Sequence, residues 1–215
     1  MDKFVEDQKK MIENHLQARG ITDSKVLAAM QAVPREEFVL SDYRSQAYSD
    51  HPLPIEENQT ISQPYIVALM AQALDIHPSD HILEIGTGSG YSAAVIAQIA
   101  KQVYGVEYFQ KLVDVSHKRF LHLGYQNILV KQGDGNLGWK EHAPYQGISV
   151  TAAAIEIPQP LLEQLDINGR LVIPIGVPFE SQKLICVTKK SHNDYSYTDL
   201  GEVTFVPLLG NIKNP

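Results

Sequence analysis

The stretch Leu83-Glu-Ile-Gly-Thr-Gly-Ser-Gly90 decides the fold of this 215-residue chain. It begins as an apolar run typical of a buried strand, passes through three glycines at alternate positions, and leads into small and apolar residues typical of a helix. Glycine lets the backbone turn tightly and lets a ligand lie close to it, because any Cβ would occupy the space of the ligand. The stretch therefore predicts a strand, a ligand-binding turn and a helix, in that order.

The pattern around this stretch alternates between helix and strand. We expect strands at residues 81–85, 103–106, 128–131, 148–151 and 171–175, and helices at about 64–75, 90–101, 109–123 and 158–165. Two more apolar runs, 183–189 and 202–209, have no helix between them and suit an antiparallel pair at one sheet edge. The sequence therefore predicts an α/β fold with a mostly parallel seven-stranded sheet, helices on both faces, and ligands at the carboxyl ends of the strands.

An N-terminal helical extension precedes this core. Residues 3–19 carry apolar residues at helical spacing and stop at Gly20, and a second helical stripe follows the cap candidates Thr22 and Asp23. Residues 41–62 are polar and broken by two prolines, so they are predicted to form a long surface loop. Loops of this length within compact domains are usually functional.

The composition excludes several classes of protein. The net charge of −7 does not favour a surface for polyanions, because phosphate contacts come mainly from Lys and Arg. The longest apolar run has seven residues, far short of the roughly 20 that span a membrane, and no signal-peptide pattern opens the chain. A single cysteine, Cys186 in an apolar run, is predicted to be buried and excludes an intramolecular disulfide and a multi-cysteine zinc site. The eight histidines form no metal-ligand pattern, so we expect no metal.

The glycine spacing distinguishes between two kinds of nucleotide site. The dinucleotide fingerprint would require a third glycine at position 91, where this chain has Tyr91. The observed G-x-G-x-G, preceded by the acid Glu84, resembles motif I of the class I S-adenosylmethionine (SAM) methyltransferases. Glu107 ends the next predicted strand, where a carboxylate can accept both ribose hydroxyls; the alternative is a solvated acid at a helix start. Asp134, after the third strand, either accepts from an adenine amino group or simply forms a turn.

Three further segments resemble one methyltransferase family, the protein-L-isoaspartate (D-aspartate) O-methyltransferases. They are Asn58-Gln-Thr-Ile-Ser-Gln-Pro-Tyr65, the helix at 26–35, and Thr204-Phe-Val-Pro-Leu208, which is similar to the C-terminal strand of that family. The resemblance implies a Rossmann-like class I SAM-dependent methyltransferase fold in a single domain over residues 1–215. Residues 1–79 would hold the N-terminal helices and the active-site loop, and residues 80–215 the SAM-binding α/β core with its C-terminal antiparallel strands.

The resemblance also implies an activity. Members of this family use SAM to methylate the α-carboxylate of L-isoaspartyl residues in damaged proteins and peptides, and the ester then collapses to a succinimide that partly reopens as aspartate. We therefore expect a monomeric cytoplasmic repair enzyme that binds isoaspartyl proteins and neither nucleic acid nor membranes. Ser62 is the active-site residue that the resemblance assigns. The resemblance and the glycine motif together imply that the following residues bind the cofactor: Gln59, Thr60, Ile61, Glu84, Gly86, Thr87, Gly88, Ser89, Gly90, Glu107, Tyr108, Asp134 and Gly135.

The chemistry of such a reaction suits these residue types. A carboxylate with a pKa near 4 is already ionised at pH 7, so methyl transfer to it needs alignment and removal of water and no general base. A cation held against this carboxylate would blunt it as a nucleophile, whereas a neutral hydroxyl such as that of Ser62 would orient it. The alternative role of Ser62 is to cap the helix that follows Gln63.

Two departures from the family pattern raise doubt about turnover. Glu56 and Glu57 replace the usual glycines before Gln59, and we expect this stiffer, more acidic loop to weaken the binding of an anionic substrate. Gln146 replaces an acid, which we interpret as support for the glycine turn. One alternative is therefore a SAM-binding protein with lost or altered activity. A second is a nucleic-acid amino-methyltransferase, since Ser62-Gln-Pro-Tyr65 faintly resembles the Asp/Asn-Pro-Pro-Tyr motif but lacks its leading amide or acid.

Overall fold

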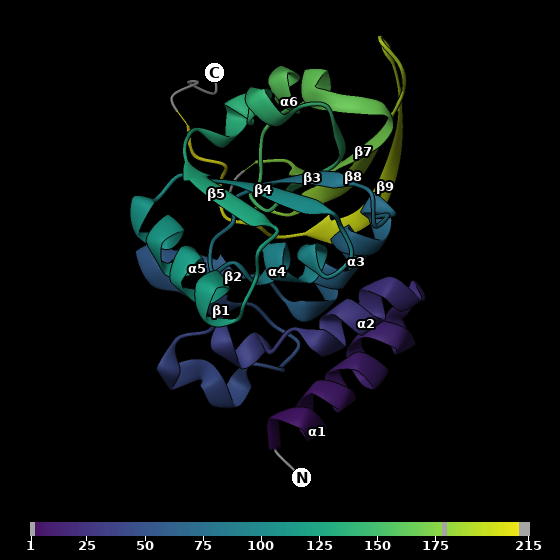
Figure 1. Ribbon diagram of the computed structural model, residues 1–215. Helices are drawn as coiled ribbons and strands as arrows, with labels where there is room; N and C mark the ends of the chain where they lie inside the picture. The colour runs from purple at the N-terminus through teal and green to yellow at the C-terminus, as the bar shows by residue number, and fades with distance from the viewer. Residues whose placement is uncertain (1–2, 178–179, 211–215) are drawn as a thin grey trace.

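The computed structural model describes residues 3–177 and 180–210, so both ends of the expected 1–215 domain lie outside the described residues. Its centre is a seven-stranded sheet in the order β5-β4-β3-β6-β7-β8-β9 (Figure 1). Neighbouring strands from β5 to β7 pair in parallel, and β8 and β9 add antiparallel strands at one edge. The strands are β3 (His81–Ile85), β4 (Gln102–Glu107), β5 (Ile128–Gln132), β6 (Tyr145–Val150), β7 (Leu165–Ile175), β8 (Gln182–Ser191) and β9 (Asp194–Val203). The predicted fold class is confirmed.

Helices cover both faces of the sheet, as predicted. Figure 1 shows α3 (Pro64–Leu74), α4 (Tyr91–Ala97) and α5 (Gln110–His122) on one face, and α6 (Gln159–Gln164) on the other. A separate apolar cluster fills each side. The helix predicted at 90–101 ends earlier, because the chain turns after Ala97. There the Asn127 side chain donates hydrogen bonds to the backbone oxygens of Ala97 and Ala100.

The N-terminal extension is helical over the predicted span but is not uniform. The α-helix α1 (Lys3–Lys10) continues into a π-helical turn (Met11–Leu16) and a 3₁₀ turn (Gln17–Arg19). Gly20 stops it with a φ of 91°, a left-handed conformation that suits glycine. The second helix, α2 (Ser24–Ala32), is capped by Asp23, whose side chain accepts hydrogen bonds from two backbone N–H groups of the first turn.

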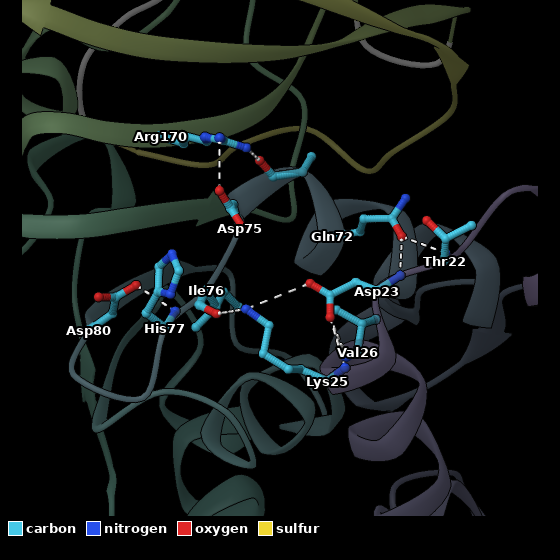
Figure 2. Close-up of polar contacts among 11 residues, drawn as sticks. Thr22, Asp23, Lys25, Val26, Gln72, Asp75, Ile76, His77, Asp80 and Arg170 are labelled. Carbon is cyan, nitrogen blue, oxygen red and sulfur yellow. Dashed lines mark hydrogen bonds and ion pairs between the residues drawn. The ribbon is translucent and has the colours of Figure 1, made fainter.

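Gln72 of α3 fixes this extension to the core, as Figure 2 shows. Its Oε1 accepts from the backbone N–H groups of Thr22 at 2.7 Å and Asp23 at 2.9 Å, and its Nε2 donates to the backbone oxygen of Gly20 at 3.3 Å. All three partners are backbone groups that the helix ends leave unpaired. One side chain therefore holds the junction between the two N-terminal helices against the sheet-covering layer.

The segment predicted as a surface loop, residues 41–62, is more structured than expected. It contains 3₁₀ turns at Ser41–Gln46 and Glu56–Asn58 and a short hairpin of β1 (Leu53–Pro54) and β2 (Thr60–Ile61). Leu53, Ile55 and Ile61 are buried in the main apolar cluster. The polar residues between them hid this pattern, and the prediction of a simple surface loop was wrong.

The C-terminal strand was predicted in the wrong place. The partner of β8 is the polar strand Asp194–Val203, and Thr204 to Leu208 leave the sheet. The N–H of Phe205 donates to Gln182 Oε1 at 2.7 Å, and the N–H of Leu208 donates to the oxygen of Ala153 at 2.7 Å. Because β9 is an exposed edge strand, its sequence lacks the apolar alternation on which the prediction relied.

Gln146 lies near the amino ends of the central strands β6 and β3, and the glycine turn lies at the opposite, carboxyl end of β3. Its Oε1 accepts from the backbone N–H of His81 at 2.9 Å, and its Nε2 donates to Asp166 Oδ2 at 3.0 Å. His81 begins β3, whereas the glycine turn follows the end of β3. The interpretation of Gln146 as support for the turn was therefore wrong. An amide suits this place because it both accepts and donates, whereas an acid would face Asp166 with like charge.

Glu84 is a carboxyl inside the sheet core. It is fully buried on β3, and neither of its oxygens completes a hydrogen bond among the described residues. Burial raises its pKa to about 8; the nearby Ser92 hydroxyl and Ala93 N–H lower the pKa, and the charge of Glu107 raises it further. Glu84 thus contributes to the pH dependence of folding.

We expect Glu84→Gln to stabilise the protein progressively as the pH rises. The raised pKa means that the folded state holds the proton more tightly than the unfolded chain, so the wild type loses stability between its ordinary pKa of 4.5 and about 8. The neutral amide has no such loss, and the gain over wild type should grow by about 2–4 kcal/mol between pH 5 and pH 8.5. Urea unfolding at both pH values measures it. The expectation would be contradicted if Glu84→Gln raised the free energy of unfolding equally at the two pH values. It would also be contradicted if the exposed control Glu163→Gln showed the same pH-dependent gain.

Candidate functional site

A cavity opens where the carboxyl ends of β3, β4 and β6 meet. The space between its walls, counted together with the part that is open to solvent, is about 730 Å³. It is lined by residues of the loop before α3, the glycine turn, the strand ends and the C-terminal segment: Gln59, Thr60, Ile61, Ser62, Val67, Ile85, Gly86, Thr87, Gly88, Ser89, Tyr91, Ser92, Val106, Glu107, Tyr108, Phe109, Gly135, Thr151, Ala152, Val206, Pro207, Leu208 and Leu209. The cavity lies at the carboxyl ends of the strands, where the sequence predicted a ligand.

The three glycines of the turn have different roles. All have positive φ, at 86° for Gly86, 54° for Gly88 and 92° for Gly90. A Cβ on Gly86 would lie 2.7 Å from Thr151 Oγ1, and one on Gly90 would lie 2.7 Å from the Phe120 ring, so these two are also required by packing. At Gly88 the nearest atom would be 3.5 Å away. Of the three, Gly88 best matches the predicted close approach of a ligand.

Glu107 is the buried acid of the cavity wall. It ends β4, is 5% exposed, and accepts hydrogen bonds from the N–H of Gly88 at 2.8 Å and of Phe109 at 3.0 Å. The alternative of a solvated acid was therefore wrong. Each carboxylate oxygen still has acceptor capacity for a ligand hydroxyl. One side chain both holds the glycine turn and presents negative charge to the cavity.

Most of the residues predicted to bind cofactor line this cavity, but three do not. Glu84 lies in the core behind the turn, and Gly90 begins α4 against Phe120. Asp134 caps a 3₁₀ turn, and its Oδ1 accepts from the backbone N–H of Asn136 at 2.9 Å and from the side-chain nitrogen of the same residue at 2.8 Å. For Asp134 the structure shows the turn that was the alternative to adenine recognition.

Thr151 is a residue of the site that the sequence analysis missed. It follows β6, lines the cavity, and its Oγ1 donates to the backbone oxygens of Ile85 and Gly86. Its position at a strand end was a usable signal. The C-terminal wall, from Val206 to Leu209, had no such signal, because it reaches the cavity through contacts distant in sequence.

Ser62 lies at the junction of the cavity with a second hollow. It lines both, and the described structure gives its hydroxyl no partner in the protein. The helix α3 begins after Gln63 without a side-chain cap, so the capping alternative was wrong. The hydroxyl is therefore available to a ligand at the opening between the two spaces.

The second hollow is a groove that adjoins the cavity, with a space of about 1680 Å³ that includes the part open to solvent. It shares Thr60, Ser62, Thr151 and Val206 with the cavity. The rest of its wall comes from the extension, the loop before α3, α3 itself, the residue before β8, β9 and the segment that follows β9: Arg19, Pro52, Gln63, Tyr65, Ile66, Leu69, Ser181, Leu200, Glu202, Val203, Thr204 and Phe205. A larger molecule lying in the groove would meet a small molecule in the cavity at Ser62.

The two unusual acids of the loop face α5 rather than the site. Glu57 Oε1 lies 3.2 Å from Lys111 Nζ, and the charge of Glu56 acts on Arg119, where it opposes the lowering of that pKa by burial. Neither acid lines the cavity or the groove. The two acids are therefore not placed to repel an anionic substrate, and the prediction that they weaken its binding was wrong. Glu57 and Asn58 have φ of 57° and 56°, the left-handed region that glycine adopts without strain.

Residues 3–177 and 180–210 contain neither a cluster of metal-ligand side chains nor a membrane-spanning helix. No group of three or more His, Cys, Asp or Glu side chains in this part is arranged to hold a metal ion. No helix there is both long enough and apolar enough to cross a membrane. Cys186 is buried on β8, as predicted.

Comparison with known proteins identifies the family. The model of the family "Protein-L-isoaspartate(D-aspartate) O-methyltransferase (PCMT)" matches residues 6–213. A protein of Protochlamydia amoebophila (strain UWE25) named protein-L-isoaspartate O-methyltransferase is 54% identical over 200 residues, which cover 93% of this chain and 95% of that protein.

Two solved structures are also similar. One, named protein-L-isoaspartate O-methyltransferase, has a TM-score of 0.86 and 31% identity over 95% of this chain and 66% of that chain. The other is a putative member from Plasmodium falciparum in complex with S-adenosyl-L-homocysteine, with a TM-score of 0.79 and 28% identity over 94% of this chain and 98% of that chain. The chain belongs to the protein-L-isoaspartate (D-aspartate) O-methyltransferase family.

Proposed function

We propose that the protein transfers the methyl group of SAM to the free α-carboxylate of L-isoaspartyl residues in damaged proteins and peptides. The observation that carries this proposal is the position of Ser62, whose hydroxyl lies where the cavity meets the groove. A methyl donor in the cavity and a peptide in the groove would meet at this point. Family membership and the names of the relatives support the same reaction.

The residues of the cavity fit SAM. Gly88 leaves room beside the backbone, the buried carboxylate of Glu107 suits the ribose hydroxyls, and Tyr108 lies at the wall with 41% of its surface exposed. The loop residues Gln59 and Thr60 close the cavity from the other side. When bound, SAM supplies an electrophilic methyl group on a sulfonium. The Plasmodium relative with S-adenosyl-L-homocysteine, the demethylated form of SAM, supports this assignment.

The protein contributes alignment to this reaction. The substrate carboxylate is ionised at pH 7, so its oxygen forms the bond to the methyl carbon as the methyl–sulfur bond breaks, and no proton has to move. Ser62 donates a hydrogen bond that orients this anion, and the walls of the cavity and the groove limit the water around the reacting atoms. No Lys or Arg is among the described residues that line the cavity, so no cation of this wall withdraws charge from the attacking oxygen. The products are a methyl ester and S-adenosyl-L-homocysteine.

We further propose that residues 1–215 act as one domain, as a monomer in the cytoplasm, with isoaspartyl proteins as partners. The contacts of Gln72 with residues 20–23 support the single domain. The net charge of −7 argues against nucleic acid as a substrate.

Incubation with labelled SAM should methylate an isoaspartyl peptide and leave its aspartyl isomer unlabelled. The product should release methanol in mild base, because it is an ester. Scintillation counting of the peptide and of the volatile fraction measures both. Base-stable methyl groups, or label on DNA, RNA or amines, would contradict the proposal. SAM binding without any transfer would favour the alternative of a binding protein.

Glu107→Ala should weaken SAM binding by about 10- to 150-fold. The substitution removes a charged acceptor, worth about 1.5–3 kcal/mol. Titration calorimetry measures the affinity. Because Glu107 also holds Gly88, the matched control is Asp80→Ala, which removes a buried acid that accepts from the His77 N–H at 2.8 Å. The control should lose stability and keep its SAM affinity; an equal loss of affinity in both variants would place Glu107 outside the ligand contacts.

Ser62→Ala should lower catalytic efficiency by about 10- to 150-fold with little change in stability. The lost hydrogen bond to a charged group is worth about 1.5–3 kcal/mol, and each 1.4 kcal/mol is about tenfold in rate. No cap is lost, so the melting temperature should match wild type and the control Ser79→Ala, and SAM affinity should stay within a few-fold. Steady-state kinetics and thermal unfolding test this. A parallel fall in activity, stability and SAM affinity would show that Ser62 only builds the loop.

A further inference from the structure

Arg19 places a positive charge in the wall of the groove. Its guanidinium carbon lies 3.5 Å from the centre of the Tyr65 ring, and its Nη1 lies 2.9 Å from Asp50 Oδ2. The side chain of Arg19 remains 42% exposed. Stacking on an aromatic ring and pairing through one nitrogen fix a guanidinium and leave its other N–H groups for a further partner. Nε and Nη2 have no such partner within the described residues.

The position of Arg19 is fixed in advance by the fold. It is the last helical residue before Gly20, at the end of the first helical segment of the extension. Gln72 holds the backbone of residues 22 and 23 (Figure 2) and that of residue 20. Gln72 and Tyr65 are seven residues apart on α3, which is two helical turns, so they lie on one side of the helix. The same helix therefore anchors the backbone after Arg19 and supports its guanidinium. A preorganised cation loses little entropy when it binds an anion.

Arg19 is also the one positively charged residue among the described residues that line the groove. Asp50, which pairs with it, is not part of the groove wall, so it orients the guanidinium from behind. Among the described residues of the wall the one acid is Glu202, which is in register with Lys183 on the neighbouring strand. The positive charge of the described groove wall thus comes from Arg19 alone.

We propose that Arg19 is a specificity-determining residue that favours isoaspartyl substrates with an Asp or Glu close to the damaged residue. This inference rests on the proposed function. Three peptide units separate Ser62 from Tyr65, at most about 11 Å, and an extended peptide advances about 3.3 Å per residue. The Tyr65 backbone is thus about three extended residues from Ser62; the Tyr65 ring and the 3.5 Å to the Arg19 guanidinium add to this distance, and the length of the substrate's own acidic side chain offsets them. We therefore expect the acidic residue within about four residues of the isoaspartyl residue.

The partner of Arg19 is this neighbouring side chain and not the reacting carboxylate. A guanidinium on the attacking oxygen would withdraw the charge that makes the oxygen nucleophilic. The Ser62 hydroxyl lies at the cavity mouth and serves the reacting group, whereas Arg19 lines only the groove. The effect of Arg19 should therefore be on KM and leave kcat nearly constant.

The experiment uses isoaspartyl peptides of one length, in which each of the four positions on either side of the isoaspartyl residue is in turn Glu, Gln or Lys. Wild type should prefer Glu over Gln at one or more positions by about 2- to 5-fold in kcat/KM at low salt, through KM, because partly exposed ion pairs are weak. The preference should shrink at 0.5 M NaCl. Arg19→Gln should abolish it, Arg19→Lys should keep part of it, and Arg19→Glu should shift it to Lys.

Arg44 provides the matched control. It pairs with Glu37 and lies 5.8 Å from the Phe4 ring, but it does not line the groove. Arg44→Gln should keep the wild-type peptide preference. Methylation of all peptides with equal KM, or a preference for Glu that persists in Arg19→Gln, would overturn the inference alone. Failure to methylate any isoaspartyl peptide would overturn the proposed function and the inference with it.

Discussion

The site depends on how the glycine turn after β3 is held. The N–H of Gly88 donates to Glu107 at the end of β4, and Thr151 after β6 donates to the backbone oxygens of Ile85 and Gly86. The two strands that flank β3 thus each fix one part of the turn. The price of this arrangement is that the carboxylate expected to bind the ribose is also a structural group. The turn and the ligand share one acceptor, so ligand affinity and local order are coupled at Glu107.

The sequence predicted this core well because its signals are local. An apolar strand of parallel sheet, buried on both faces, is a continuous apolar run, and β3 was placed to the residue. The edge strand β9 has no buried face and hence no such run, so the neighbouring apolar segment 202–209 was mistaken for it. The apolar residues of this segment pack beside the ligand site instead, and Val206 and Leu208 line the cavity. The apolar character of the segment correctly indicated that it is buried, but it did not show whether the segment is buried as a strand or as part of the cavity wall.

The site residues divide in the same way. Gly86 and Gly88 were found because a strand end and a glycine turn are adjacent in sequence, and Glu107 was found because it ends the next predicted strand. Gln146 was misplaced because the sequence does not show at which end of a strand a polar residue acts. The predicted cofactor contact of Glu84 failed for a related reason, since alternate residues of a strand face opposite sides and its side chain points into the core.

The distribution of charge then explains how an acidic protein can receive an anionic substrate. Net charge governs the distant field, but local pairs govern the potential inside a groove. The loop acids Glu56 and Glu57 face the basic side chains of α5, which leaves Arg19 as the charge beside Tyr65. The N-terminal extension, which contains Arg19, is attached to the core by α3. The end of α3 is held in turn by Arg170 of β7, whose Nη2 lies 3.0 Å from Asp75 Oδ2 (Figure 2). On the proposed role of Arg19, binding selectivity at the groove depends on the packing of a segment that lies outside the glycine turn.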